Sequence, residues 1–330
     1  MAKGWKITLI IVASLLLLIL IFASVYYLWP WNRDFFNEAN VEFNIPGLNT
    51  NFCPQGFTKI EGQNKYLISG YMSDNTSSRI YVINGEDGSV EKYFTLKDGA
   101  GGNYIGHAGG ICSAGSTIWI VSEGQCFRLL LTAVNNVEDG SYVSIVDKFE
   151  TQCGADYIFA NDGYLWVGEF YKKGKYETSE DHYISVAGGK INHSIVYGFK
   201  ISESNNFGLL SIIPSMALSV RDLVQGIQIS NDGKIILSTS YGLSDSILYK
   251  YDSVLNRACN DTIRVGFYDV PIWYLDDDSL LSSKKIPSMS EEIVINNDRV
   301  YILFESGCRK YRAFVRKRIN NVYSVPISYI

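Results

Sequence analysis

The sequence has few of the residues, and none of the short motifs, that mark common enzyme classes. Only three histidines occur among its 330 residues, and they are too few and too dispersed for a zinc site. The patterns G-x-S-x-G, H-E-x-x-H, C-x-x-C and the P-loop are all absent. The sequence therefore gives no support for a nucleophile-elbow hydrolase, a zinc protease, a dithiol oxidoreductase or a P-loop nucleotide-binding protein.

Charged residues are also scarce. They make up 19% of the chain, the net charge is −5 at pH 7, and no cluster of Lys and Arg is interleaved with stacking aromatics. We therefore expect no nucleic-acid partner. The basic run 309–318 is the exception, and its alternation predicts a solvated edge strand whose charge discourages strand addition. With 47% apolar residues, the rest of the chain can bury a large core.

One long hydrophobic run is present, at residues 7–28. As a helix it would be roughly 33 Å long, at about 1.5 Å per residue, which is enough to cross a bilayer. Lys3 and Lys6 precede the run, aromatic residues follow it, and no A-x-A cleavage site ends it. We therefore predict a cytoplasmic segment at 1–6 and an uncleaved, single-pass signal anchor at 7–28 in the cell membrane. Residues 29–51 are then a tether that could supply a ring-closing strand, and residues 52–330 are the extracytoplasmic domain.

Five related phrases recur in the exported part of the chain. Each contains a short strand, a tight turn rich in Gly, Asn and Asp, and an apolar strand that ends in a polar residue. Their first strands are anchored at Phe57, Ile111, Tyr157, Ile227 and Ile293. The intervals of 54, 46, 70 and 66 residues fit four-stranded units plus loops. The pattern predicts an all-β propeller of five four-stranded blades, with six blades as the alternative.

The sequence has six cysteines. In an exported domain, an even number of cysteines usually indicates disulfide bonds. Four of them occupy matching places in the phrases, either before the first strand or after the second: Cys53, Cys153, Cys126 and Cys308. The exit of one blade neighbours the entry of the next, so these offsets predict the disulfides Cys126–Cys153 and Cys53–Cys308. The other interpretation is that all are buried free thiols.

A propeller has a central channel along its axis. When the five phrases are superposed, polar residues occupy equivalent positions at the mouth of this predicted channel. Glu123, Glu169 and Glu305 share one position at the end of the second strand. A second shared position, at the entry of the first strand, also carries amide and acid side chains. The candidate ligand-binding residues are Gln55, Tyr71, His107, Glu123, Glu169, Tyr171, Gln225, Tyr241, Glu291 and Glu305.

This mouth is compatible with two functions and with a structural role. The metal candidates Glu123, Glu169, Glu291 and Glu305 could hold Ca²⁺, which takes six to eight oxygen ligands. His107 would then be the candidate general base of a hydrolase or lactonase-like enzyme. Alternatively, the acids and an aromatic rim bind a polar ligand, such as a saccharide, a peptide or a cell-surface partner, without chemistry. In the structural interpretation, the glutamates cap backbone amides and hold the blades of a scaffold together.

Four segments carry a family resemblance: HAGGI, NDGYLWVGEFY, VQGIQISNDGKIILSTSYG and MSEEIVINNDRVYILFESG. They are similar to the blade signatures of exported bacterial propellers, and loosely to the gluconolactonase and streptogramin-lyase-like superfamily. The resemblance covers about residues 53–312 and implies a propeller fold. It does not carry an activity, because Glu291 or Glu292 alone matches the Glu, Asn and Asp metal set of gluconolactonases.

Overall fold

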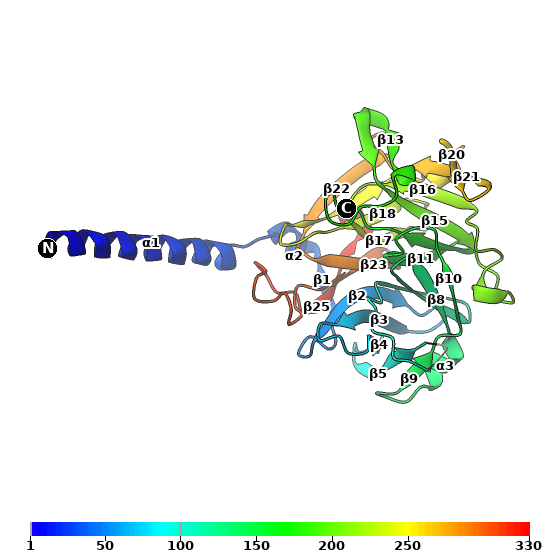
Figure 1. Ribbon diagram of the computed structural model, residues 1–330, viewed down its shortest axis with the longest axis horizontal. Coiled ribbons are helices and arrows are strands. Elements are labelled where there is room, and N and C mark those ends of the chain that lie inside the picture. The colour runs from blue at the N-terminus through cyan, green and yellow to red at the C-terminus, as the bar shows by residue number, and fades with distance from the viewer. Residues whose placement is uncertain (1, 99–100) are drawn as a thin grey trace.

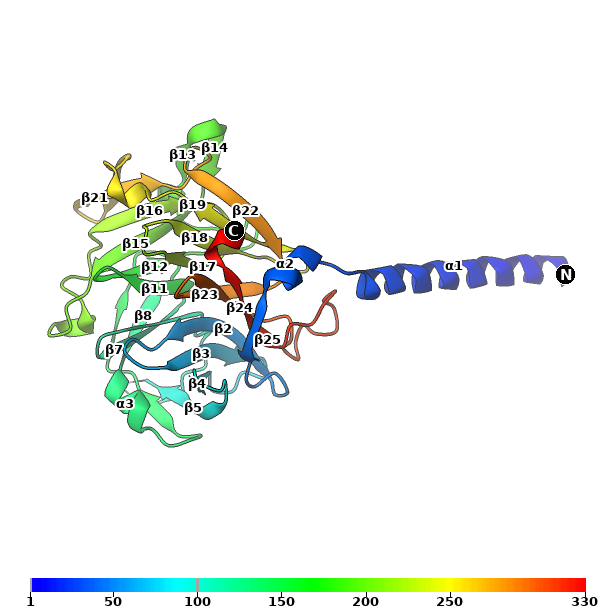
Figure 2. The same cartoon turned by 180° about the vertical axis from the view of Figure 1, so that it is seen from behind.

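The protein is a ring of five β-sheets from which one long helix extends (Figures 1 and 2). The structure is a computed structural model, and it describes residues 2–98 and 101–330. Among the described residues, each sheet of the ring contains four to six strands. A separate two-stranded hairpin consists of β13 (Ile184–Val186) and β14 (Lys190–Asn192). The architecture is a five-bladed β-propeller, which confirms the fold predicted from the repeat.

The innermost strand of each blade is its first repeat strand. These strands are β2 (Phe52–Lys59), β6 (Gly110–Ala114), β11 (Tyr157–Asn161), β17 (Val224–Ile229) and β23 (Ser290–Asn296). Each contacts the innermost strand of the next blade, and β23 contacts β2, so the ring is closed.

The remaining strands pair outward from the axis. Blade one adds β3 (Lys65–Met72), β4 (Arg79–Asn84), β5 (Val90–Lys97) and β9 (Tyr142–Ser144), and blade two adds β7 (Thr117–Ser122), β8 (Gln125–Leu130) and β10 (Asp147–Glu150). Blade three adds β12 (Tyr164–Gly168), β15 (Ser194–Lys200), β16 (Met216–Val220), β21 (Tyr268–Tyr274) and β20 (Asp261–Val265). Blade four adds β18 (Ile235–Thr239), β19 (Ser246–Tyr251) and β22 (Leu280–Ile286). The helix α3 (Leu131–Asn136) follows β8.

Tight turns explain why the inner hairpins form. Between β11 and β12, Asp162 and Gly163 have φ values of 49° and 74°. Two consecutive positive φ values suit the short turns that match the twist of paired strands, and Asp-Gly adopts them readily. The apolar faces of the hairpins then pack between neighbouring blades, where Trp119, Trp166 and Phe57 are fully buried.

Blade five combines the two ends of the chain. It contains β23, β24 (Arg299–Phe304), β25 (Asn321–Pro326) and, outermost, β1 (Asn40–Asn44), which pairs antiparallel with β25. The helix α2 (Arg33–Glu38) precedes β1 and buries Phe35 against Phe304 and Tyr323. An N-terminal strand in the last blade covers an edge that would otherwise be open.

The alternative of six blades depends on two strand-like segments outside the five phrases, at 192–215 and 262–279, and their strands belong to blade three. The first supplies β15 and leads into β16, and the second forms the β20–β21 hairpin. β21 runs parallel to β16, so that Ala217 pairs with Ile272. The hairpin therefore extends an existing sheet instead of starting a new one.

The basic run 309–318 is not a strand, so this prediction is wrong. It forms turns in the loop between β24 and β25, anchored by the buried Val315. The alternation of its charges therefore does not reflect sheet pleating.

The helix α1 (Ala2–Leu28) extends away from the ring (Figure 1). It is long and apolar enough for either a membrane anchor or a signal sequence. Its last turn contacts the propeller, because the Tyr26 hydroxyl donates to the Phe314 carbonyl oxygen at 3.0 Å.

Candidate functional site

The register of the inner hairpins shows which residues of the five blades are equivalent. Strand one pairs with strand two at Phe57–Ile68, Ile111–Ile120, Ile158–Val167, Ile227–Leu237 and Ile293–Ile302. The main-chain amides of Phe57, Ile111 and Ile158 also donate to one shared acceptor, the carboxyl group of Glu292. Ile158 is therefore the reference residue of blade three, one position later than the Tyr157 expected from the repeat.

Two rings of side chains follow from this register. The entry ring lies two residues before each reference residue and consists of Gln55, Gly109, Asp156, Gln225 and Glu291. The exit ring lies three residues after each pairing partner and consists of Tyr71, Glu123, Phe170, Ser240 and Glu305. All of these residues line one cavity of about 530 Å³, which is the mouth of the channel. The repeated backbone thus presents a different pair of side chains from each blade.

The structure brings eight of the ten predicted ligand-binding residues together at this mouth. They are Gln55, Tyr71, His107, Glu123, Gln225, Tyr241, Glu291 and Glu305. Tyr171 does not line it, because its ring is buried and stacks on His193 at 4.3 Å between centroids.

Glu169 is also outside the mouth, because blade three is shifted by one residue relative to the predicted superposition. The exit-ring position belongs to Phe170, and Glu169 is 2% exposed. Its carboxylate lies 2.7 Å from His182 Nδ1 and accepts hydrogen bonds from the amides of Gly154 and Ile195. Glu169 therefore caps two main-chain amides within blade three.

One side of the mouth is aromatic. Phe170 lies 5.7 Å from Tyr176 and 6.3 Å from Tyr241, measured between ring centroids. The Lys175 ammonium group lies 4.9 Å and 5.7 Å from the rings of Tyr176 and Tyr241. Such faces can stack against the apolar face of a sugar ring or against a cation.

The same mouth contains a pair of carboxyl groups from blade five. Glu291 is 3% exposed and is hydrogen-bonded to Glu305. Burial raises the pKa of both groups, and the negative charge of Glu305 raises that of Glu291 further. The pair therefore retains a proton near neutral pH, and it can donate one hydrogen bond and accept others.

His107 is connected to this pair through Gln55. His107 Nε2 lies 2.8 Å from Gln55 Oε1, and Gln55 Nε2 donates to Glu305 Oε2 at 3.0 Å. Enclosure in the mouth and the charge of Lys310 lower the pKa of His107, so its ring is neutral at pH 7 and donates from Nε2. The ring stacks on Tyr71 with 4.5 Å between centroids. The chain of contacts orients His107, Gln55 and Glu305 relative to one another.

The four glutamates proposed as calcium ligands do not converge on one point. Glu169 is paired with His182 inside blade three, and Glu305 is bonded to Gln55 and Glu291. Among the described residues, no group of three or more His, Cys, Asp or Glu is placed to hold a metal ion.

Neither predicted disulfide is formed in the part of the chain that the structure describes. Cys53 Sγ and Cys308 Sγ lie 3.5 Å apart, beyond the roughly 2.05 Å of a disulfide bond. Cys126 and Cys153 are also free, because the Cys153 thiol faces Thr151 and the carbonyl oxygen of Val167 at 3.7 Å each. The repeat offsets nevertheless placed Cys53 and Cys308 correctly as neighbours between blades one and five.

Glu292 lies at the ring axis beneath the mouth and is 1% exposed. Its Oε2 accepts from the amides of Phe57 at 2.7 Å and Ile111 at 3.2 Å, and its Oε1 accepts from that of Ile158 at 2.9 Å. Burial raises its pKa to about 8, against the opposing effect of these donors. One side chain of blade five thus binds the inner strands of blades one, two and three.

Two residues of the mouth, Tyr176 and Tyr311, were missed by the sequence interpretation. Asp156 also lines the mouth, where the superposed phrases had placed it, at the entry of a first strand. Asp156 accepts from the Phe170 amide at 2.7 Å, and burial raises its pKa to about 6. Its place before a first strand was a usable signal, whereas Tyr176 and Tyr311 come from loops whose path the repeat does not determine.

Comparisons with known proteins concern the fold. No family model matches the sequence, and no curated protein matches it. Aldose sugar dehydrogenase from Streptomyces coelicolor is 12% identical, with a TM-score of 0.46 over 87% of this chain and 96% of that one. Glutaminyl cyclase from Myxococcus xanthus is 11% identical, with a TM-score of 0.43 over 81% and 91%. BamB from Moraxella catarrhalis is 9% identical, with a TM-score of 0.33 over 87% and 97%.

Proposed function

We propose that the protein is a membrane-anchored, extracytoplasmic propeller that binds a polar ligand, most simply a neutral saccharide, at the channel mouth. The observation that supports this proposal is the composition of one cavity. The amide and acid groups of the entry ring line it together with the rings of Phe170, Tyr176 and Tyr241. Its volume of about 530 Å³ lies within the range of small-ligand sites, about 300 to 1,000 Å³.

The charge state of the mouth favours an uncharged ligand over a cationic peptide. The carboxyl pair of Glu291 and Glu305 retains a proton, and Lys175 and Lys310 bring positive charge to the rim. Hydroxyl groups can both donate to the amide and carboxyl oxygens and accept from Gln225 or the protonated carboxyl. An aromatic wall then covers the apolar face of the same sugar ring.

Binding is tested with the full chain in a detergent that has no sugar headgroup. Neutral oligosaccharides are titrated calorimetrically into the wild type and into Gln225→Ala and Tyr241→Ala. Each variant should bind about tenfold more weakly, because it loses one hydrogen bond or one stacking face. The control is Tyr268→Ala, an exposed tyrosine on the outer edge of blade three. The proposal would be refuted if none of the oligosaccharides bound to the wild type, or if the affinity fell equally in Tyr268→Ala.

A second candidate function is hydrolysis of the same ligand. It is favoured by the adjacent carboxyl groups of Glu291 and Glu305 in the mouth, because a pair of carboxyl groups can supply a general acid and a general base. In that case Glu291→Gln and Glu305→Gln should both abolish product formation, as followed by mass spectrometry. If the ligand stays intact after prolonged incubation with the wild type, the protein binds it without hydrolysing it.

A further inference from the structure

The loop between β24 and β25 carries an unusual concentration of positive charge. Residues 309–318, called here the basic loop, contain six Lys and Arg residues and no acid. Arg309, Lys317 and Arg318 are exposed. Among the described residues, Arg316 is the only one of the six that forms an ion pair with a carboxylate, that of Asp245 at 2.6 Å. Most of the charge in the basic loop is therefore not neutralised within the protein.

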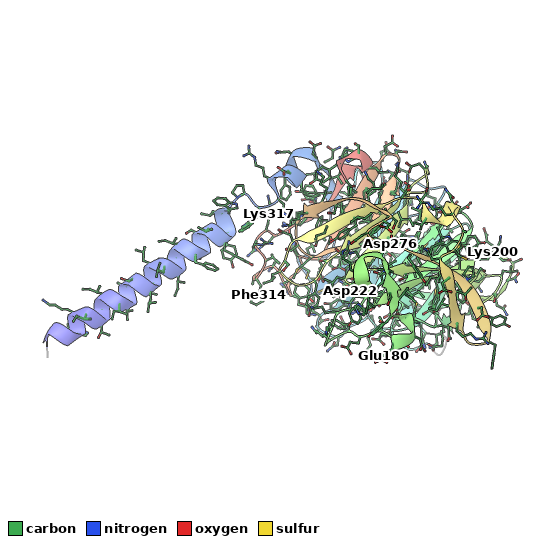
Figure 3. The ribbon with its side chains drawn as sticks, turned by 90° about the horizontal axis from the view of Figure 1, so that it is seen from above. Glu180, Lys200, Asp222, Asp276, Phe314 and Lys317 are labelled. Atoms are coloured by element: carbon green, nitrogen blue, oxygen red, sulfur yellow. The ribbon has the colours of Figure 1, made fainter. Side chains whose placement is uncertain are left out.

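The basic loop lies against the C-terminal end of α1. The Tyr26 hydroxyl donates to the Phe314 carbonyl oxygen at 3.0 Å, and the Tyr27 hydroxyl donates to that of Ala313 at 3.3 Å. The Arg316 guanidinium also covers the ring of Trp31 at 4.5 Å from its centroid. Figure 3 shows Phe314 and Lys317 beside the end of the helix and Lys200 at the opposite side of the propeller.

These contacts determine where the basic loop lies relative to a bilayer. A helix of 27 residues is about 40 Å long, and the hydrocarbon core is about 30 Å thick. The last turn of α1, with Tyr26 and Tyr27, therefore lies at the level of the headgroups. The Phe314 side chain is 63% exposed at this level, and Arg312 and Arg316 lie two residues before and after it in the sequence. An apolar tip among Lys and Arg is the chemistry of a peripheral membrane contact.

We propose that the basic loop is a second membrane contact, which binds anionic phospholipid headgroups of the bilayer that α1 spans and inserts Phe314 into the interface. This inference rests on the membrane anchoring in the proposed function. The loop begins in the mouth, because Tyr311 and Glu305 line the cavity and Lys310 donates to Tyr71 at 2.7 Å. Lipid contact would therefore hold the mouth beside the membrane surface.

The test uses the full chain, one copy per lipid nanodisc, in phosphatidylcholine alone or with added phosphatidylglycerol. Hydrogen exchange of the peptide amides of residues 309–318 is followed by mass spectrometry. Anionic lipid should slow this exchange, and high salt should remove the effect, because each cation near an anionic surface contributes roughly fivefold to binding. Arg309→Gln with Lys317→Gln should lose most of the protection. The matched control is Lys200→Gln with Arg264→Gln, two exposed cations on blade three.

The possible outcomes are distinguishable. The inference is overturned if the amides of residues 309–318 exchange at the same rate in both lipids. It is also overturned if the control pair loses as much protection as Arg309→Gln with Lys317→Gln. Failure of the chain to enter nanodiscs refutes the anchor itself, and the inference with it, whereas saccharide binding is measured separately. Unchanged protection of the inner strands reports that the variants are folded. Phe314→Ser gives a second variant, which should also reduce the protection by anionic lipid.

Discussion

Replacing Glu292 tests how the ring is held together. Its carboxyl group accepts hydrogen bonds from three inner strands, and its pairing with Ile158 at 2.9 Å joins blade five to blade three across the axis. Glutamine has nearly the same shape but only one acceptor atom. Above pH 8, where both oxygens of the ionised Glu292 accept, the carbonyl oxygen of Glu292→Gln can keep the bonds from Phe57 and Ile111, while the NH₂ group then faces the Ile158 N–H, donor against donor.

The expected loss follows from the number of amides left without an acceptor. One buried amide without a partner costs about 1 to 3 kcal/mol, so Glu292→Gln should lower the free energy of unfolding by about that amount. Glu292→Ala removes all three acceptor contacts and should cost roughly 3 to 9 kcal/mol by the same count. Because whole domains are stable by about 5 to 15 kcal/mol, the alanine variant should lose a large part of the stability of the domain. The glutamine variant is therefore the informative one.

The free energy of unfolding is measured by urea titration of the full chain in detergent, followed by the fluorescence of the buried Trp119 and Trp166. Glu123→Gln is the matched control, because Glu123 is exposed at the mouth, and its variant should stay within about 0.5 kcal/mol of the wild type. Faster hydrogen exchange at Ile158 than at Phe57 would identify the lost bond. A Glu292→Gln variant as stable as the wild type would refute the role of this carboxyl group.

Four other predictions concern the same ring. Because burial raises the pKa of Glu292 from 4.5 to about 8 on folding, its protonated form favours the folded state, and this stability is complete below pH 4.5 and is lost as the pH rises through 8. Unfolding at a series of pH values should show a smaller loss in Glu292→Gln than in the wild type, with the remainder due to Glu291 and Glu305, and equal slopes would contradict it. Gly226→Ala should cost about 1 to 3 kcal/mol, because a Cβ atom would lie 2.8 Å from the Glu292 Cα, and an unchanged melting temperature would contradict this. Mild treatment with a small-molecule disulfide should link Cys53 to Cys308 before any other pair, as peptide mapping can show; a different first pair would be the contrary result. Millimolar Ca²⁺ and chelator should leave the melting temperature unchanged, since the four candidate glutamates do not converge, and a rise with Ca²⁺ would restore the calcium site.

The fold was predictable because its determinants are local. Each inner hairpin has its own turn residues, such as Asp162 and Gly163, and the spacing of the copies fixes the number of blades. The outer elements were less predictable. The β20–β21 hairpin could have joined blade three or blade four, since the parallel pairing of Ala217 with Ile272 depends on packing between distant segments.

The candidate site shows the limit of matching residue types. Glu169 resembles Glu123 and Glu305 in sequence, because each ends an apolar second strand. The structure places Phe170 at the shared position, since the register of blade three is set by the bond from the Ile158 amide to Glu292. That bond joins residues 134 apart in the sequence, so no local pattern could reveal it. Successive residues of a strand point to opposite faces, so an error of one residue in the superposition exchanges the two faces. The superposition therefore assigned Glu169 to the mouth, whereas its side chain lies inside the blade.

Blade five combines features that no other blade shares. It is the only blade with acids at both the entry and exit positions, Glu291 and Glu305, and it also supplies Glu292 to the axis. Its second strand leads from Glu305 into the basic loop, and its outermost strand, β1, follows α1 and α2. In the proposed function, one sheet therefore carries both the carboxyl pair of the ligand site and the loop that would contact the membrane.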